Sequence, residues 1–505
     1  MFPELAFSFA KKFFSKPLHP VMPLKFFQKI RTSKTNSADR RVYLAYPPGN
    51  FLYLSLIILI GINSHAYAQK LTLFQILEEG KQNYPFLKSK QAEIKVAESR
   101  MNSVKTDYLP SFIVQHQYTF STGNNVQGAF LPNEGSALSP SGGIRPENIY
   151  KGAFGSFSTA MVDWRVFNFG KVNANVKAAK AEISRGQADY ENELFQHQVR
   201  IIDSYLVLLI NQKLVEAQRQ NLERALIFKQ VIDAAVGSGM RPGVDGSLAS
   251  AEFAKARILL LESRRAEKAQ RLRISELTGN LRDSIEIDTM HFYSQLPSVR
   301  GTQNSILKNP SLLFSQAQID ASYARSLAVR KSFLPSVSLT TAGWGRGSGV
   351  SNKNDAYRTD FASGVNYQIF NYLFGISTRW NLTGILKIRN DYKAEQFQVE
   401  RFKQIYNTQK IQLDRQSREA EMQLELSLEQ AKLTPVQLDA AQSAFNQAEA
   451  RYENGLTDLF TLTQSVTTLN RAEVDRYITN GNVWRALLMK AAAAGDLSLF
   501  LNQLN

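Results

Sequence analysis

Apolar and polar side chains alternate along four short stretches of the chain, two in each half. Most residues at every second position are apolar over 112–120 and again over 160–166. A period of two with one apolar face is typical of a β-strand. In the second half the same alternation begins at Val337 for an outgoing strand and recurs over 361–369 for a returning strand. The pattern therefore predicts one β-hairpin in each half, over 111–168 and 336–370.

A proline-bounded segment precedes each predicted hairpin. Pro85 and Pro110 enclose the first segment, Pro310 and Pro335 enclose the second, and both segments have helix-forming composition. Proline is tolerated in the first turn of a helix, because its missing N–H would have no partner there. A second proline stops the helix and favours extended backbone in the residue before it. Each segment is therefore expected to be a helix of about six turns that passes directly into a strand.

A long helical stretch follows each hairpin. We expect these helices over 172–236 and 376–454, and each would extend about 100 Å at 1.5 Å per residue. Pro435 lies inside the second stretch, where it predicts a kink.

Two pairs of glycines repeat at one spacing. Gly239 and Gly455 follow the long helices, Gly279 and Gly495 follow the next helices, and the members of each pair are 216 residues apart. These next helices are expected over 247–278 and 457–494. Such landmarks indicate an internal duplication. We assign 69–280 to the first repeat, 281–307 to a linker, 308–495 to the second repeat and 496–505 to a C-terminal tail.

The N-terminal region has the organisation of a secretory signal. Residues 1–49 carry nine Lys or Arg against two acidic residues, and a twelve-residue apolar run follows from Phe51. The run is short for a membrane-spanning helix, which needs about 20 apolar residues. It ends near Ala66-Tyr67-Ala68, so 50–68 is expected to be a signal peptide cleaved before Gln69. An uncleaved inner-membrane anchor is the alternative, and the basic extension 1–49 is interpreted as a start codon assigned too far upstream.

Composition excludes several classes of chemistry. The chain has 505 residues and no cysteine, which removes disulfides and thiolate metal sites. Its net charge of +16 includes +7 from residues 1–49, and no stretch interleaves aromatic and basic residues as a nucleic-acid groove would. The five histidines are dispersed, with no metal-ligand spacing. We therefore expect no enzyme activity, no cofactor, no metal and no nucleic-acid partner.

Four strands are too few to close a barrel. Inside a bilayer an open sheet edge would leave unpaired backbone groups, each costing several kcal/mol. If the strands lie in a membrane, several chains must therefore share one barrel. The Ala-rich helices, with narrow apolar stripes, suit a tube of coiled-coil pairs better than a globular core.

The ordered set of motifs resembles the TolC-like outer-membrane efflux proteins over roughly residues 70–500. The motifs are NYP…YLPSF, KNP…FLPSV, FNFG, FNYLFG, SGMRPGVD, ENGLTD and ELTG. The resemblance implies a mainly α fold with a β-barrel portion: a homotrimer whose chains each give four strands to a 12-stranded barrel in outer-membrane lipid, above a periplasmic helical tunnel. It also implies a passive exit duct for efflux or type I secretion. Its partners would be a periplasmic adaptor and an inner-membrane pump of the resistance-nodulation or ABC type.

The resemblance also suggests residues for a pore gate. Asp245 matches an acidic position of the family after the first glycine turn. After the second turn, the positions of the family's gate aspartates hold Thr461 and Gln464, and the nearest carboxylate is Asp458. Two interpretations remain open for Asp245 and Asp458: an electrostatic gate, or first-turn and capping residues of their helices.

The two glycine turns are the expected docking sites for the adaptor, through Gly239, Met240, Gly455 and Leu456. Two other classes of protein also contain coiled coils. A periplasmic adaptor carries one helical hairpin with small β-domains, which the doubled plan contradicts. A purely structural coiled coil would not need the alternating aromatic strands.

Overall fold

The computed structural model describes residues 72–122, 147–280, 287, 292–293, 295–297, 306–351 and 356–504. The expectations for the N-terminal extension and the signal peptide lie outside these residues, as does most of the linker expected at 281–307.

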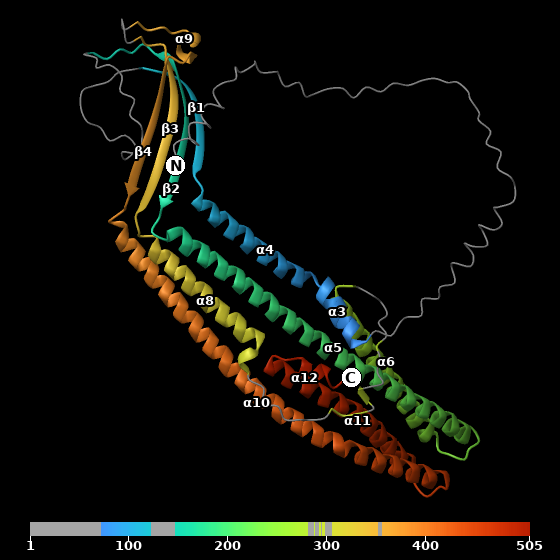
Figure 1. Cartoon of the computed structure of the whole chain (residues 1–505). Helices are drawn as coiled ribbons and strands as arrows, with labels where there is room; N and C mark the ends of the chain where they lie inside the picture. Colours follow the sequence, from blue (N-terminus) through green and yellow to red (C-terminus); the bar gives the residue numbers. More distant parts are fainter. Residues whose placement is uncertain are drawn as a thin grey trace, which may run out of the picture. The chain divides into compact units, whose positions relative to one another are not determined.

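The strands form one antiparallel sheet in the order β1-β2-β3-β4 (Figure 1). Their bounds are Ser111–Ser121 for β1, Ala153–Phe167 for β2, Ser336–Ser348 for β3 and Ile369–Arg379 for β4. β1 pairs with β2 and β3 pairs with β4, as expected for one hairpin in each half, and β2 with β3 joins the two hairpins. A sheet of four strands with one hairpin in each half is therefore confirmed, the positions of β1, β2 and β3 agree with the alternation, and the two halves share one sheet.

The returning strand of the second half differs from its predicted bounds. Residues Phe361–Val365 form the short helix α9, and β4 begins only at Ile369. The side chain of Asp360 caps α9 by accepting a hydrogen bond of 2.8 Å from the backbone N–H of Ser363. Gly364 lies so close to Phe154 that a Cβ there would come within 2.3 Å of the Phe154 Cβ. This local cap and close packing on β2 outweigh the alternating pattern of 361–369.

The helices continue the strands in the same order. α4 (Pro85–Lys105) leads into β1, β2 leads into α5 (Lys171–Gly237), α8 (Pro310–Lys331) leads into β3, and β4 leads into α10 (Gly384–Glu453). α4 packs on α5, and α8 packs between α5 and α10 (Figure 1). The sheet thus passes into a helical layer without a change of neighbours.

Two helices return from the far ends of α5 and α10. α6 (Gly243–Thr278) packs on α5, α11 (Leu459–Ala494) packs on α10, and α11 also contacts α5. We call these pairs the helical hairpins α5/α6 and α10/α11. The remaining elements are α3 (Leu73–Asn83), α12 (Ser498–Leu501) and the 3₁₀ turns η1 (Thr106–Tyr108) and η3 (Ile306–Lys308).

Several helix bounds differ from those expected. α6 begins at Gly243 rather than 247, and α10 begins at Gly384 rather than 376 because β4 continues to Arg379. Residues 498–501 of the expected tail form α12. α10 continues through Pro435. Proline has no N–H to donate to the carbonyl of Ala431, and the hydroxyl of Thr434 donates a 3.3 Å hydrogen bond to this carbonyl instead.

No helix among the described residues is both long enough and apolar enough to cross a membrane.

The largest apolar core lies where α3, α5, α6, α11 and α12 meet. Trp484 of α11 is 1% exposed, and its ring contacts Phe292 and Phe500 at centroid distances of 5.0 and 5.9 Å. Its indole N–H donates a 3.0 Å hydrogen bond to the carbonyl of Phe292. The buried aromatic group therefore has its polar atom satisfied, as a stable core requires.

The duplication recurs at the ends of α6 and α11. Gly279 and Gly495 have φ of +71° and +75° and end these helices in the left-handed conformation. A Cβ at Gly279 would lie 2.8 Å from the carbonyl oxygen of Asn83, and one at Gly495 would lie 2.5 Å from the Cα of Asn309. The side chain of Asn309, which is 1% exposed, donates to the carbonyls of Ala492 (3.0 Å) and Ala493 (3.1 Å). Glycine is needed here for its backbone angle and for close approach.

Gly495→Ala is expected to lower the thermal unfolding temperature more than Gly455→Ala does. Both glycines have positive φ, for which an alanine costs about 1–2 kcal/mol, but no atom lies within 4 Å of a Cβ built at Gly455. Only Gly495→Ala adds a backbone clash. Thermal unfolding followed by circular dichroism compares the two variants. Equal losses would contradict the role assigned to the Asn309 contact.

Candidate functional site at the paired helical turns

Each helical hairpin reverses through the same backbone turn. Gly239 (φ +76°) follows α5, and the N–H of Met240 bonds the carbonyl of Ala235 at 2.9 Å. Gly455 (φ +71°) follows α10, and the N–H of Leu456 bonds the carbonyl of Arg451 at 2.8 Å. This is the Schellman arrangement, which requires a left-handed residue and so favours glycine. We call residues 238–245 and 454–461 the paired turns.

Apolar side chains are exposed at both turns. Met240 and Val244 are 75% and 70% exposed, and Leu456 and Phe460 are 68% and 69% exposed. Sequence analysis singled out Met240 and Leu456 but missed Val244 and Phe460. The signal was available, because each lies four residues after its partner and the two are again 216 residues apart. Exposed apolar groups that cluster in this way are typical of a protein-binding surface.

Asp458 is the N-cap of α11. Its carboxylate accepts hydrogen bonds from the backbone N–H of Thr461 at 2.9 Å and from the Thr461 hydroxyl at 2.6 Å. These two donors hold the pKa of the Asp458 carboxyl below its usual range. The structure thus brings together two of the residues suggested for the gate. Gln464 is exposed on α11 further along the helix.

Asp245 lies in the first turn of α6, and its charge acts on Tyr452 of α10, in the other helical hairpin. Burial raises the pKa of the Tyr452 hydroxyl, Arg241 opposes this shift, and the charge of Asp245 adds to it. The Arg241 guanidinium lies 4.5 Å from the centroid of the Tyr452 ring and donates a 3.3 Å hydrogen bond to the Tyr452 carbonyl. Arg241 therefore links the first turn to α10. No sequence pattern singled out Arg241 or Tyr452, because their contact depends on the packing of the two hairpins.

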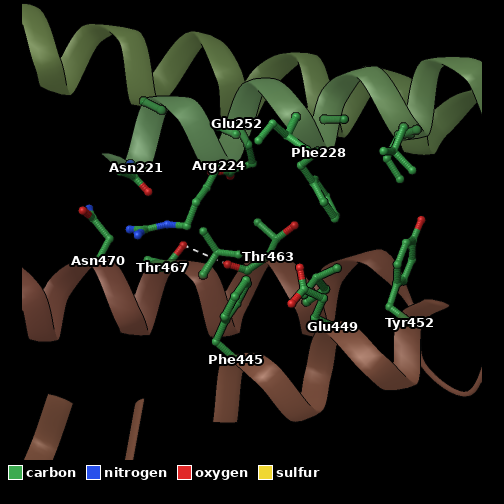
Figure 2. Close-up of a pocket in the computed structure, with 18 of the residues that line it drawn as sticks. Asn221, Arg224, Phe228, Glu252, Phe445, Glu449, Tyr452, Thr463, Thr467 and Asn470 are labelled. Carbon is green, nitrogen blue, oxygen red and sulfur yellow. Dashed lines mark hydrogen bonds between the residues drawn. The ribbon is translucent and has the colours of Figure 1, made fainter. Parts of the chain in front are cut away.

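The two helical hairpins enclose a cavity of about 550 Å³ behind the paired turns (Figure 2). At its edge Arg224 of α5 makes a two-pronged ion pair with Glu473 of α11, at 3.0 and 2.6 Å. Both side chains are largely buried, so this pair fixes the two hairpins against each other more firmly than an exposed pair would.

The strand register sorts the side chains of the sheet onto two faces. On one face Phe112 is opposite Val162, Val162 is opposite Thr341, and Thr341 is opposite Phe374. The exposed large side chains of β1 and β4 on this face are Phe112, Val114, Tyr118, Phe120, Phe370, Tyr372, Phe374 and Ile376.

The opposite face is more polar. Its ladders include Gln115 opposite Thr159, Thr159 opposite Trp344, and Trp344 opposite Asn371. An apolar aromatic face backed by a polar face is the pattern of a strand between lipid and a water-filled lumen. β1 and β4 are the outer strands, and among the described residues each pairs on one side only.

Comparison with known proteins agrees with this geometry. The family model described as outer membrane efflux protein matches residues 76–280 and 302–487. No curated protein sequence gives a significant match to this chain.

Solved outer-membrane channels have a similar fold. The Campylobacter jejuni CmeC channel is 14% identical, with 84% of this chain and 85% of that chain covered and a TM-score of 0.68. Vibrio cholerae VceC is 16% identical, with 84% and 96% covered and a TM-score of 0.66. The open state of Neisseria gonorrhoeae MtrE is 13% identical, with 84% and 89% covered and a TM-score of 0.64.

The family match spans both repeats and most of the described chain. The protein therefore belongs to the outer membrane efflux protein family and is an outer-membrane efflux channel, not an enzyme.

Proposed function

We propose that three copies of the chain form the exit duct of a tripartite efflux or type I secretion system. The observation that carries this proposal is a single four-stranded sheet with sorted faces and two outer strands of equal length, 11 residues each. β4 of one copy can pair with β1 of the next, and three copies then close a 12-stranded barrel without an open edge. The aromatic face would meet lipid and the polar face would line the lumen.

The helices extend this barrel into the periplasm in the proposed assembly. Four helices continue the four strands in the same order, so three copies would surround the lumen with twelve helices. The sequence shows no group of catalytic residues that could drive transport. An inner-membrane pump of the resistance-nodulation or ABC type would supply the energy for export.

The paired turns are the proposed contact with a periplasmic adaptor. They repeat one backbone motif and present four exposed apolar side chains, which are Met240, Val244, Leu456 and Phe460. A partner with a repeated apolar contact could engage both turns in the same way. This arrangement favours docking at the turns over docking on the charged helix surfaces.

We also propose that Asp245 is the principal gate carboxylate. The carboxylate of Asp458 already accepts two hydrogen bonds from Thr461, so part of its charge is used to cap α11. Thr461 and Gln464 carry no charge, so each paired turn holds one carboxylate, Asp245 in the first and Asp458 in the second. A cation that enters between the turns would therefore be held mainly by Asp245.

Phe374→Arg is expected to reduce assembly of the trimer, whereas Asn371→Arg is expected to be tolerated. The two residues are on opposite faces of β4, and an arginine facing lipid near the midplane costs about 2–4 kcal/mol. The fraction of heat-resistant trimer on a semi-native gel measures the effect. Equal trimer yields from both variants would contradict the assigned lipid face.

Asp245→Asn is expected to weaken block of single-channel conductance by a multivalent cation about three- to tenfold, through loss of one charge per copy. Asp458→Asn is expected to change block less, and asparagine should preserve the helix start because it also caps helices well. Planar-bilayer recording measures both. Unchanged block in Asp245→Asn would remove this residue as a gate residue.

Met240→Asp and Leu456→Asp are expected to abolish export without loss of the folded trimer, because a charge at either turn would oppose apolar docking. Met422→Asp is the matched control, since Met422 is 54% exposed on α10 but lies outside the turns. Cells that lack the gene should become sensitive to toxic compounds. Restored resistance with the turn variants would argue against docking at these positions.

A further inference from the structure

The cavity between the helical hairpins has the size of a small-molecule site. Its volume of about 550 Å³ falls in the range of about 300–1,000 Å³ found for ligand pockets. Both repeats contribute walls, with α5 and α6 on one side and α10 and α11 on the other (Figure 2). The apolar part is lined by Phe228, Ile232, Ala256, Phe445, Leu462 and Val466.

Three polar atoms of the lining have no hydrogen-bond partner among the described residues: Nε of Arg224, the hydroxyl of Tyr452 and the side-chain oxygen of Asn470. Tyr452 is only 7% exposed, and its hydroxyl is unpaired. The side-chain oxygen of Asn470 is also buried and unpaired. The two residues lie toward opposite ends of the row of lining side chains, with Phe228 and Thr463 between them (Figure 2). A buried unpaired polar group destabilises a protein by about 1–3 kcal/mol, so a ligand that reached either group would regain that energy.

The charges of the lining favour a cation. Arg224 is paired with Glu473, and Lys255 lies 3.4 Å from Glu252, so these positive charges are already compensated. Glu449 lines the cavity from α10 and has no ion-pair partner among the described residues. Its carboxylate is therefore available to a positive group.

Arg241 and Glu453 are the two other charged residues of the lining, and neither has an ion-pair partner among the described residues. Arg241 stacks on the ring of Tyr452, and Glu453 follows Tyr452 on α10. With Glu473 included, the charged residues at the cavity sum to one negative charge, and Glu449 and Glu453 are the carboxylates without an ion-pair partner among the described residues. The ring of Phe228, whose centroid lies 5.9 Å from that of Tyr452, adds a face that attracts a cation, whereas the Arg241 guanidinium already lies over the Tyr452 ring.

We propose that this cavity binds a lipophilic organic cation, with an apolar or aromatic body between Phe228 and Val466 and its positive charge near Glu449. An N–H or O–H group on the ligand would donate to the free oxygen of Asn470. Because the walls come from both hairpins, the bound ligand favours conformations that keep the hairpins at this spacing. Binding would thus oppose any separation of the two hairpins.

Ethidium is a suitable probe, since it joins a positive charge to an aromatic body and carries two amino groups. Its fluorescence is measured on titration into the purified full-length protein. Glu449→Gln is expected to weaken binding about three- to tenfold, through loss of one charge contact. Glu429→Gln, an exposed change on α10 outside the lining, is the matched control and is expected to leave the affinity unchanged.

Val466→Trp tests the position of the site, because the larger side chain fills the apolar part of the cavity. It is expected to weaken ethidium binding at least tenfold while the protein elutes at the same volume as the unmodified one. If the tryptophan variant does not fold, Glu449→Gln and Asn470→Ala carry the test through the charge and hydrogen-bond contacts.

Equal ethidium affinity in Glu449→Gln and Glu429→Gln would overturn the proposal. Unchanged ethidium affinity in Asn470→Ala, or in a Val466→Trp variant that folds, would also overturn it, as would tighter binding of the anion anilinonaphthalene sulfonate than of ethidium. The measurement needs neither a pump nor an adaptor. A failure of the tripartite assignment in cells would therefore leave this result unaffected, and the reverse also holds.

Discussion

The need to pair the backbone groups at the edges of a four-stranded sheet governs the organisation of this channel. In the part of the chain that the structure describes, β1 and β4 each pair on one side only. In water the free edges could be hydrated, but in hydrocarbon each unpaired group costs several kcal/mol. Membership of an outer-membrane channel family therefore makes the single chain an incomplete unit, and the missing hydrogen bonds have to come from other copies.

The sheet also determines the order of the helices. Proline at the start of α4 and α8 and proline just before β1 and β3 make each helix end where a strand begins. Because no loop long enough to reorder the elements separates a strand from its helix, neighbours in the sheet remain neighbours among the helices. Ion pairs such as Lys90–Asp189 between α4 and α5, at 2.8 Å, then hold adjacent helices together.

The two glycine turns share a backbone conformation but differ in their side chains. Gly239 and Gly455 form the same turn, yet Arg241 corresponds in position to Thr457, and Tyr452 corresponds to Val236. Arg241 contacts Tyr452, whereas the equivalent positions hold Thr457 and Val236, which cannot form a cation–aromatic contact.

The sequence alone determined the features that depend on local geometry. Alternation located β1, β2 and β3, and prolines and glycines located ends of the helices, because each of these signals acts through the backbone of a few adjacent residues. Local signals failed at 361–369, where capping by Asp360 and the contact of Gly364 with Phe154 produced α9 instead of a strand. The second of these contacts joins residues that are far apart in sequence.

Only the tertiary structure decided which groups meet. The pairing of β2 with β3 placed Phe112 and Phe374 on one face and Gln115 and Asn371 on the other. The packing of the two hairpins brought Arg241 onto Tyr452 and left the cavity beside Glu449. Periodicity within a segment carries no information about the register or separation of two segments, since these depend on how side chains from distant parts of the chain fit together.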